Sequence, residues 1–173
     1  ACGRLHCAPI RHTRAFKSLL CDNAPTSTVA SAPSCANSTT CERRKTCGLQ
    51  LDQAVKVTRE DESGKRNQFL ENFRLFGAPH VALITAPTYL GFYAALDCGL
   101  YVNNFMLAAK SLGVDTIAQA AIAHYSDFVR EYFGIDDNRK LVCGVSFGFE
   151  DTTHPINQYR TERAKLDEVV MWK

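Results

Sequence analysis

The stretch from Arg139 to Phe149 constrains the fold of this chain more than any other. It reads Arg139-Lys-Leu-Val-Cys-Gly-Val-Ser-Phe-Gly-Phe149, with β-branched and aromatic residues and little polar alternation. This pattern is typical of a strand that is buried on both faces. Gly144 and Gly148 leave room for a close approach by another backbone or a flat ligand. The sequence therefore predicts a strand at the centre of a sheet.

Length and composition predict one globular domain. The chain has 173 residues, of which 46% are hydrophobic and 22% are charged. We expect a single domain over residues 1–173 with a core of its own. The net charge of +2 is too small to indicate binding to nucleic acid or to a membrane surface.

Neither a membrane span nor a signal peptide is expected. Leu90 to Leu112 is the most apolar run, but Asp97, Asn103, Asn104 and Lys110 interrupt it. A buried helix therefore fits better than a transmembrane helix. The first seven residues lack the apolar core of a signal peptide, so we expect a cytoplasmic protein.

The cysteines leave alternatives open. Six of the eight fall in the first 47 residues: Cys2, Cys7, Cys21, Cys35, Cys41 and Cys47. Such crowding is compatible with a disulfide or zinc module. No pair has the C-x2-C spacing of a zinc site, however, so structural thiols are the preferred interpretation. Cys98 and Cys143 lie in apolar runs and are predicted to be small buried hydrophobic residues.

Helices and strands alternate in the second half of the chain. Apolar periodicity predicts a short helix over Leu49 to Val57 and an amphipathic helix over Lys65 to Phe76. His80 to Ala86 is a predicted strand. Gly91 to Leu112 is a predicted helix that is apolar on nearly every face, and hence buried at the centre of the fold.

Shorter elements and their capping residues follow from local signals. Val114 to Ile117 is a predicted edge strand, and a helix is predicted from Ser126, as its N-cap, to Phe133 before Gly134. Thr58 and Asp61 have the spacing of a capping box.

Few residues indicate catalysis by themselves. No dinucleotide-binding glycine motif or phosphate-binding loop is present, and no nucleophile stands beside a suitable base. His124 and His154 are predicted to lie at the surface or to cap a helix. Four arginines could bind one phosphate if they converged, namely Arg11, Arg14, Arg160 and Arg163. The residues alone favour two separate solvated basic patches.

From Leu49 to Trp172 the sequence resembles the FMN-dependent nitroreductase family. The resembling segments are Gln68 to Pro79, Asp97 to Ala109, Leu112 to Thr116, Gln119 to Ala121, Leu141 to Gly148 and Tyr159 to Arg163. Their order and spacing carry the resemblance. Near the start, Arg11-His-Thr-Arg-Ala-Phe16 and Ala32-Pro-Ser-Cys-Ala-Asn37 resemble two further motifs of the family.

The first 48 residues depart from the family pattern. The opening motif is one residue short between Thr13 and Arg14. The loop that ends at Asn37 passes almost directly to Glu42-Arg-Arg-Lys. We therefore expect this part to be divergent and shortened. It is predicted to lack the first core strand of the family and the basic residue that reaches the flavin pyrimidine edge.

The resemblance implies a fold and a cofactor. It implies an α+β fold whose mixed, mainly antiparallel sheet is flanked by helices, in a domain-entwined homodimer with FMN at the subunit interface. The FMN phosphate would be held by Arg11, Thr13, Arg14, Arg160 and Arg163. The flavin ring would lie near Gln119, Ala120 and Ala121, and the small side chains of the two alanines permit close packing. Pro33, Ser34 and Asn37 would come from the partner subunit.

The resemblance also implies a reaction. NAD(P)H would reduce FMN, and a nitroaromatic, quinone or similar small-molecule acceptor would then be reduced in a ping-pong cycle. No side-chain acid or base is required. One alternative is a flavin-poor, non-catalytic relative that dimerises or binds a partner. Another is a cysteine-rich metal or redox module fused to a helical domain.

Overall fold

A computed structural model of the chain describes residues 4–8, 10–22 and 39–173, and the side chains of 15–22 and 41–173. The chain divides into two compact units. The first, here called the sheet unit, comprises Ala1–Thr26 and Asn67–Glu150. The second, the helical unit, comprises Ser27–Arg66 and Asp151–Lys173.

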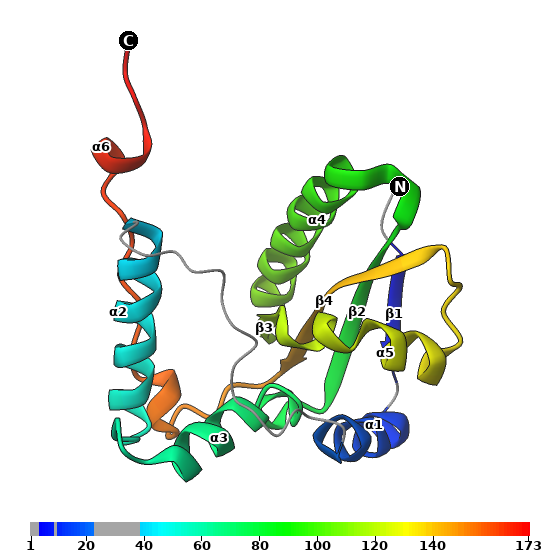
Figure 1. Ribbon diagram of the computed structural model, residues 1–173, viewed down its shortest axis with the longest axis horizontal. Helices are drawn as coiled ribbons and strands as arrows, with labels where there is room; N and C mark the ends of the chain where they lie inside the picture. The colour runs from blue at the N-terminus through cyan, green and yellow to red at the C-terminus, as the bar shows by residue number, and fades with distance from the viewer. Residues whose placement is uncertain (1–3, 9, 23–38) are drawn as a thin grey trace. The chain divides into compact units, whose positions relative to one another are not determined.

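The sheet unit is built on four antiparallel strands in the order β1-β2-β4-β3 (Figure 1). Its elements in chain order are β1 (Arg4–Ala8), α1 (Ile10–Asp22), η1 (Leu75–Gly77), β2 (His80–Pro87), η2 (Thr88–Leu90), α4 (Gly91–Ser111), β3 (Asp115–Gln119), η3 (Ala121–Tyr125), α5 (Ser126–Phe133) and β4 (Arg139–Gly148). The prediction of an α+β fold with a mainly antiparallel sheet is confirmed.

Strand β4 is an inner strand, as its sequence predicts. It pairs with β2 on one side and with β3 on the other, and Val145 at its middle is fully buried. The space over its glycines is filled by side chains of the chain itself. A Cβ built on Gly144 would lie 2.6 Å from Cδ1 of Ile122, and one on Gly148 would lie 2.8 Å from Cδ of Pro79. Neither a second backbone nor a flat ligand explains these glycines.

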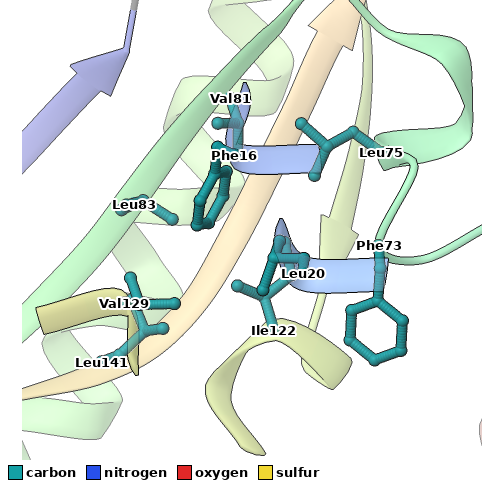
Figure 2. Close-up of a cluster of buried hydrophobic side chains, with 9 residues drawn as sticks. All are labelled: Phe16, Leu20, Phe73, Leu75, Val81, Leu83, Ile122, Val129 and Leu141. Carbon is teal, nitrogen blue, oxygen red and sulfur yellow. The ribbon is translucent and has the colours of Figure 1, made fainter. Parts of the chain in front are cut away.

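One face of the sheet is closed by α1, η3 and α5. Phe16 and Leu20 of α1 are fully buried against Val81 and Leu83 of β2 (Figure 2). The cluster is completed by Phe73, Leu75, Ile122, Val129 and Leu141. Rings from α5 also contact Phe16, whose centroid lies 4.9 Å from that of Phe133. Burial of these large apolar side chains holds together elements that are far apart in the sequence.

The other face of the sheet is covered by α4. Ala94 and Cys98 are buried against Ala82 and Ile84 of β2 and against Val145. The predicted helix over residues 91–112 is therefore present, but its predicted burial at the centre of the fold is wrong. Among the described residues, only one side of α4 packs against the sheet.

The opposite side of α4 carries exposed apolar residues. Leu96, Leu100 and Leu107 are 49%, 60% and 62% exposed, and Phe92 is 78% exposed. Their spacing of four, four and seven residues places them on one side of the helix. We call these four residues the apolar stripe.

The predicted helix over residues 65–76 ends earlier than expected. Helix α3 runs over Glu62–Leu70, and residues 71–74 form turns. Leu75, Phe76 and Gly77 then have positive φ angles of 56°, 49° and 79°. This left-handed path cannot continue a helix. It brings Leu75 into the core instead, where it is fully buried.

Two predicted caps differ in the structure, and one is confirmed. The Asp61 carboxylate, and not Thr58, caps α3: it accepts hydrogen bonds from the Gly64 N–H and the Ser63 hydroxyl, both at 2.8 Å. These bonds lower the pKa of Asp61. Ser126 lies inside α5, where its hydroxyl accepts a bond from the Leu141 N–H at 3.3 Å. Gly134 ends α5 in the left-handed conformation, as predicted.

The helical unit contains α2 (Thr39–Ala54), the first turn of α3, η4 (Pro155–Asn157) and α6 (Leu166–Val169). Helix α2 begins ten residues before the predicted helix over residues 49–57. Arg43 of α2 forms an ion pair of 2.7 Å with Glu168 of α6, although the two are 125 positions apart. Among the helices of the described residues, none is both long enough and apolar enough to cross a membrane.

We expect Gly144→Ala to lower the free energy of unfolding by about 1–2 kcal/mol, because the added methyl overlaps the enclosed Ile122 side chain. Gly48→Ala in α2 is the control: nothing lies within 4 Å of its Cβ position, so it should stabilise the helix slightly. Denaturant unfolding measures both. Ile122→Val removes the overlapping methyl, so it should cost less in the Gly144→Ala background than alone; equal costs would contradict the contact.

Candidate functional site

The predicted site residues fall in different parts of the chain. Gln119, Ala120 and Ala121 are consecutive in the sheet unit, and Arg160 and Arg163 belong to the helical unit. For Arg11, Thr13 and Arg14 the structure describes only the backbone, in α1. Pro33, Ser34 and Asn37 lie outside the described residues.

The side-chain amide of Gln119 links β3 to two other segments of the sheet unit by hydrogen bonds. Gln119 is the last residue of β3 and is only 3% exposed. Its amide Nε2 donates a hydrogen bond of 2.7 Å to the Asn72 carbonyl oxygen, and its Oε1 accepts one from the Ser146 hydroxyl. Both ends of the amide are therefore used inside the sheet unit. A burial of this kind is tolerated only because the polar atoms are paired.

The residues next to Gln119 in the sequence have short side chains. Ala118 and Ala120 are exposed on either side of Gln119, whereas Ala121 is half-buried against the core. Strand β3 is an edge strand, because only β4 pairs with it in the described sheet. An edge strand presents unpaired backbone N–H and C=O groups along its outer side. This edge can therefore accommodate a flat, hydrogen-bonding group at short range.

In the helical unit, Arg160 borders a small hollow. The hollow has a volume of about 210 Å³ and is lined by Gln50, Gln53, Ala54, Tyr159 and Arg160. The Arg160 Nη1 donates hydrogen bonds of 2.8 Å to the carbonyl oxygens of Asn157 and Tyr159. Burial raises the pKa of the Tyr159 phenol.

Gln50 contributes an unexpected group to the same hollow. Its buried Oε1 has no hydrogen-bond partner among the described residues. An unpaired buried amide oxygen is costly, so it is a ready acceptor for a donor that enters the hollow. Sequence reasoning missed Gln50, because no local pattern shows that α2 and the chain near residue 160 contribute to one hollow.

Arg163 is exposed and makes local contacts. Its Nη1 donates hydrogen bonds to the Thr161 hydroxyl at 2.6 Å and to the Thr161 carbonyl oxygen at 3.0 Å. The described contacts thus involve one guanidinium nitrogen. The planar, permanently charged group keeps further donors for an anionic ligand.

The histidines and acidic residues do not form a metal site in the part of the chain that is described. No group of three or more His, Cys, Asp or Glu side chains there is arranged to hold a metal ion. His154 accepts a hydrogen bond from the Ile156 N–H at its Nδ1, 3.3 Å away, and so caps η4. The prediction of a capping role is confirmed for His154, and His124 is exposed, as predicted.

Comparison with known proteins identifies the family. The family model of the nitroreductase family matches residues 26–149, which is more than half of the chain. The chain belongs to the nitroreductase family. The matched range includes β2, α4, β3 and β4, so the sheet unit described above accounts for most of it.

Two curated relatives are similar over about three-quarters of this nitroreductase-family chain. Nitroreductase NfnB of Mycolicibacterium smegmatis is 38% identical over 127 residues, 73% of this chain and 54% of the relative. The 4-nitrobenzoate reductase of Nocardioides sp. is 33% identical over 130 residues, 75% of this chain and 53% of the relative. The chain thus spans about half the length of the curated relatives it matches.

A solved structure matches nearly the whole chain. It is the crystal structure of the FMN-dependent nitroreductase NfnB from Mycobacterium smegmatis in complex with NADPH. The TM-score is 0.86 with 29% sequence identity, over 99% of this chain and 78% of that chain. The nitroreductase-like fold predicted from the resemblance is therefore confirmed.

We expect Gln119→Met to lower the free energy of unfolding by about 1–3 kcal/mol, because it leaves the Ser146 hydroxyl and the Asn72 carbonyl without their partner. Denaturant unfolding measures the change. The control is a double-mutant cycle with Ser146→Ala, in which the two costs should not add, since both variants remove the same hydrogen bond. If the two losses of unfolding free energy were fully additive, the Gln119–Ser146 hydrogen bond would be contradicted.

Proposed function

We propose that this chain carries the activity of an FMN-dependent oxidoreductase, which transfers reducing equivalents from NAD(P)H to nitroaromatic, quinone or similar acceptors. The observation that carries the proposal is the match to NfnB, described as FMN-dependent and in complex with NADPH, at 29% identity over 99% of this chain. We also propose that the two units form one functional domain over residues 1–173, in a cytoplasmic enzyme.

The end of β3 suits the flavin ring. The outer backbone edge of β3, which ends at Gln119 next to Ala120 and Ala121, offers donors and acceptors, and the exposed methyl groups of Ala118 and Ala120 add little bulk. Gln119 contributes indirectly, because its buried amide fixes this edge to Asn72 and Ser146. Bound FMN would supply the redox chemistry, by accepting hydride from NAD(P)H and reducing the acceptor in a ping-pong cycle.

Arginine side chains suit the phosphate. We propose that Arg160 and Arg163 hold it from the helical unit, together with Arg11, Thr13 and Arg14 of α1. Guanidinium groups remain charged at any physiological pH and bind phosphate with several donors at once. For Arg163, Nη1 donates to the carbonyl oxygens of Thr161 and Glu162, and Nε and Nη2 make no hydrogen bond to the described residues, so we propose that they bind the ligand.

We further propose a homodimer in which α4 meets a second copy of the chain. The apolar stripe supports this proposal, since four large apolar side chains on one side of a helix are costly to leave in water. Between them lies a hollow of about 400 Å³ lined by Phe92, Ala95, Leu96, Gly99 and Leu100. A Cβ at Gly99 would meet nothing within 4 Å, so another helix could approach closely there.

In the proposed homodimer, three residues of the site come from the partner subunit. Pro33, Ser34 and Asn37 are proposed to reach the flavin of the partner subunit.

The proposed acceptors include nitroaromatics because one relative is named a 4-nitrobenzoate reductase. No described side chain needs to act as a catalytic acid or base in this proposal.

The purified 173-residue chain, mixed with FMN, tests the proposal. We expect NADPH to bleach the flavin absorbance, and 4-nitrobenzoate to restore it while being reduced. A quinone acceptor added in parallel separates the acceptor classes. If the protein cannot be reconstituted with FMN, the proposal fails and the non-catalytic alternative is supported instead.

Arg163→Ala should weaken FMN binding roughly ten- to a hundred-fold, the ~1.5–3 kcal/mol scale of hydrogen bonds to a charged group. Arg163→Lys keeps the charge but loses the planar fork, so an intermediate loss is expected. Equilibrium titration of the apoprotein with FMN gives the affinities. Arg44→Ala, which removes an exposed arginine of α2, is the control. Equal affinities of Arg163→Ala and the parent would remove Arg163 from the site.

Ala120→Phe should prevent FMN binding while the protein stays folded, because the ring would occupy the space proposed for the flavin. The FMN content after reconstitution and the circular dichroism spectrum measure the two effects. Ala108→Phe changes an exposed alanine of α4 outside the apolar stripe and should leave the FMN content unchanged. A flavin content for Ala120→Phe equal to that of the parent would contradict the placement.

Leu100→Glu should dissociate the proposed homodimer, because it places a charge within the apolar stripe. Loss of a central interface contact costs on the order of 2 kcal/mol or more, which is about thirty-fold or more in the dissociation constant. Leu112→Glu, at a leucine that is 79% exposed beyond the end of α4, is the matched control. Sedimentation equilibrium measures both. A dimer of unchanged affinity in Leu100→Glu would rule out this face.

A further inference from the structure

Two thiols lie between α4 and β4, in the core on the α4 side of the sheet. Cys98 of α4 is 1% exposed, and Cys143 of β4 is half-buried against the same cluster. Cys98 follows the buried Ala94 by one helical turn, so it points to the sheet. Cys143 precedes the buried Val145 by two residues, so it lies on the strand face that meets α4.

Both thiols contribute to the apolar cluster that fills the space between α4 and the sheet. Burial raises the pKa of the Cys143 thiol, and the Cys98 side chain raises this pKa further. The second effect is the electrostatic repulsion of one thiolate by the other. Both residues are thiols in the structure.

Packing alone does not require sulfur at these positions. Ala82, Ile84 and Val145 fill the rest of this cluster, and an aliphatic residue would bury as well as a cysteine. Neither thiol belongs to the residues proposed to hold FMN. What distinguishes the pair from aliphatic neighbours is that it can be oxidised.

We propose that Cys98 and Cys143 form a redox-sensitive pair that closes into an intramolecular disulfide joining α4 to β4. The two thiols lose two protons and two electrons as the S–S bond forms. A two-electron oxidant such as an azo compound takes them up and becomes the hydrazine. Cys143 is the more exposed thiol, so it adds to the oxidant first, and Cys98 then displaces the reduced oxidant from the Cys143 sulfur.

The bond would fix the helix that carries the apolar stripe. Cys98 lies on the sheet-facing side of α4, whereas Phe92, Leu96, Leu100 and Leu107 are exposed. A covalent link at Cys98 would therefore hold α4 against the central strand while leaving the exposed side unaltered. This inference does not depend on the binding of FMN.

Oxidation of the full-length chain with the azo compound diamide tests the proposal. Remaining thiols are alkylated, and the unreduced protein is digested and analysed by mass spectrometry. We expect a linked peptide pair containing Cys98 and Cys143, two hydrogens lighter than the separate peptides. Both alkylated peptides should be lost together, and reduction should restore them.

Two variants make the result specific. Cys143→Ala keeps the site apolar, and after oxidation its Cys98 should be recovered fully alkylated. In Cys47→Ala, which removes an exposed thiol of α2, the Cys98–Cys143 link should form as in the parent. The proposal is overturned if Cys98 and Cys143 stay alkylatable while Cys47 is oxidised, or if Cys98 links equally to other cysteines.

Discussion

The rest of the sheet unit depends on the position of β4 between β2 and β3. Its pairing on both sides fixes the order of the strands, and its two faces separate the two cores. Close packing over Gly144 is the tightest point of this arrangement, since Ile122 of η3 occupies the space a side chain would need. Because η3 follows β3 directly, the same contact helps to position the edge around Ala120. The candidate flavin edge is thus fixed by packing in the core.

The two faces of the sheet are completed in different ways. On one face, α1, η3 and α5 bury their large side chains within the chain, and Phe16, Leu20 and Val129 are fully enclosed. On the other face, α4 buries Ala94 and Cys98 and packs larger residues such as Phe105 against the sheet, but it leaves the apolar stripe exposed. A helix with apolar residues on both sides is suited to lie between two layers. The second layer is proposed to be another copy of the chain, which links the fold to the interface site.

The sequence predicted the main elements but not their surroundings. Strands β2, β3 and β4 and helix α4 follow from strong local patterns. The burial of α4 was predicted wrongly, because apolar content alone does not say whether the covering layer belongs to the same chain. The end of α3 was missed because the left-handed residues Leu75 and Phe76 carry no glycine signal. At the candidate site, the resemblance pointed to Gln119 as a contact, whereas its amide is buried among protein partners; Gln50 was missed because its hollow joins distant segments.

The proposed interface site requires the chain to bind FMN as a dimer. Sedimentation velocity of the purified chain with FMN can be recorded at the protein band and at the visible flavin band. We expect a single species of twice the 19.2 kDa chain mass, with about one FMN for each chain moving with it. Flavin absorbance that stays at the top of the cell while the protein sediments as a monomer would contradict it.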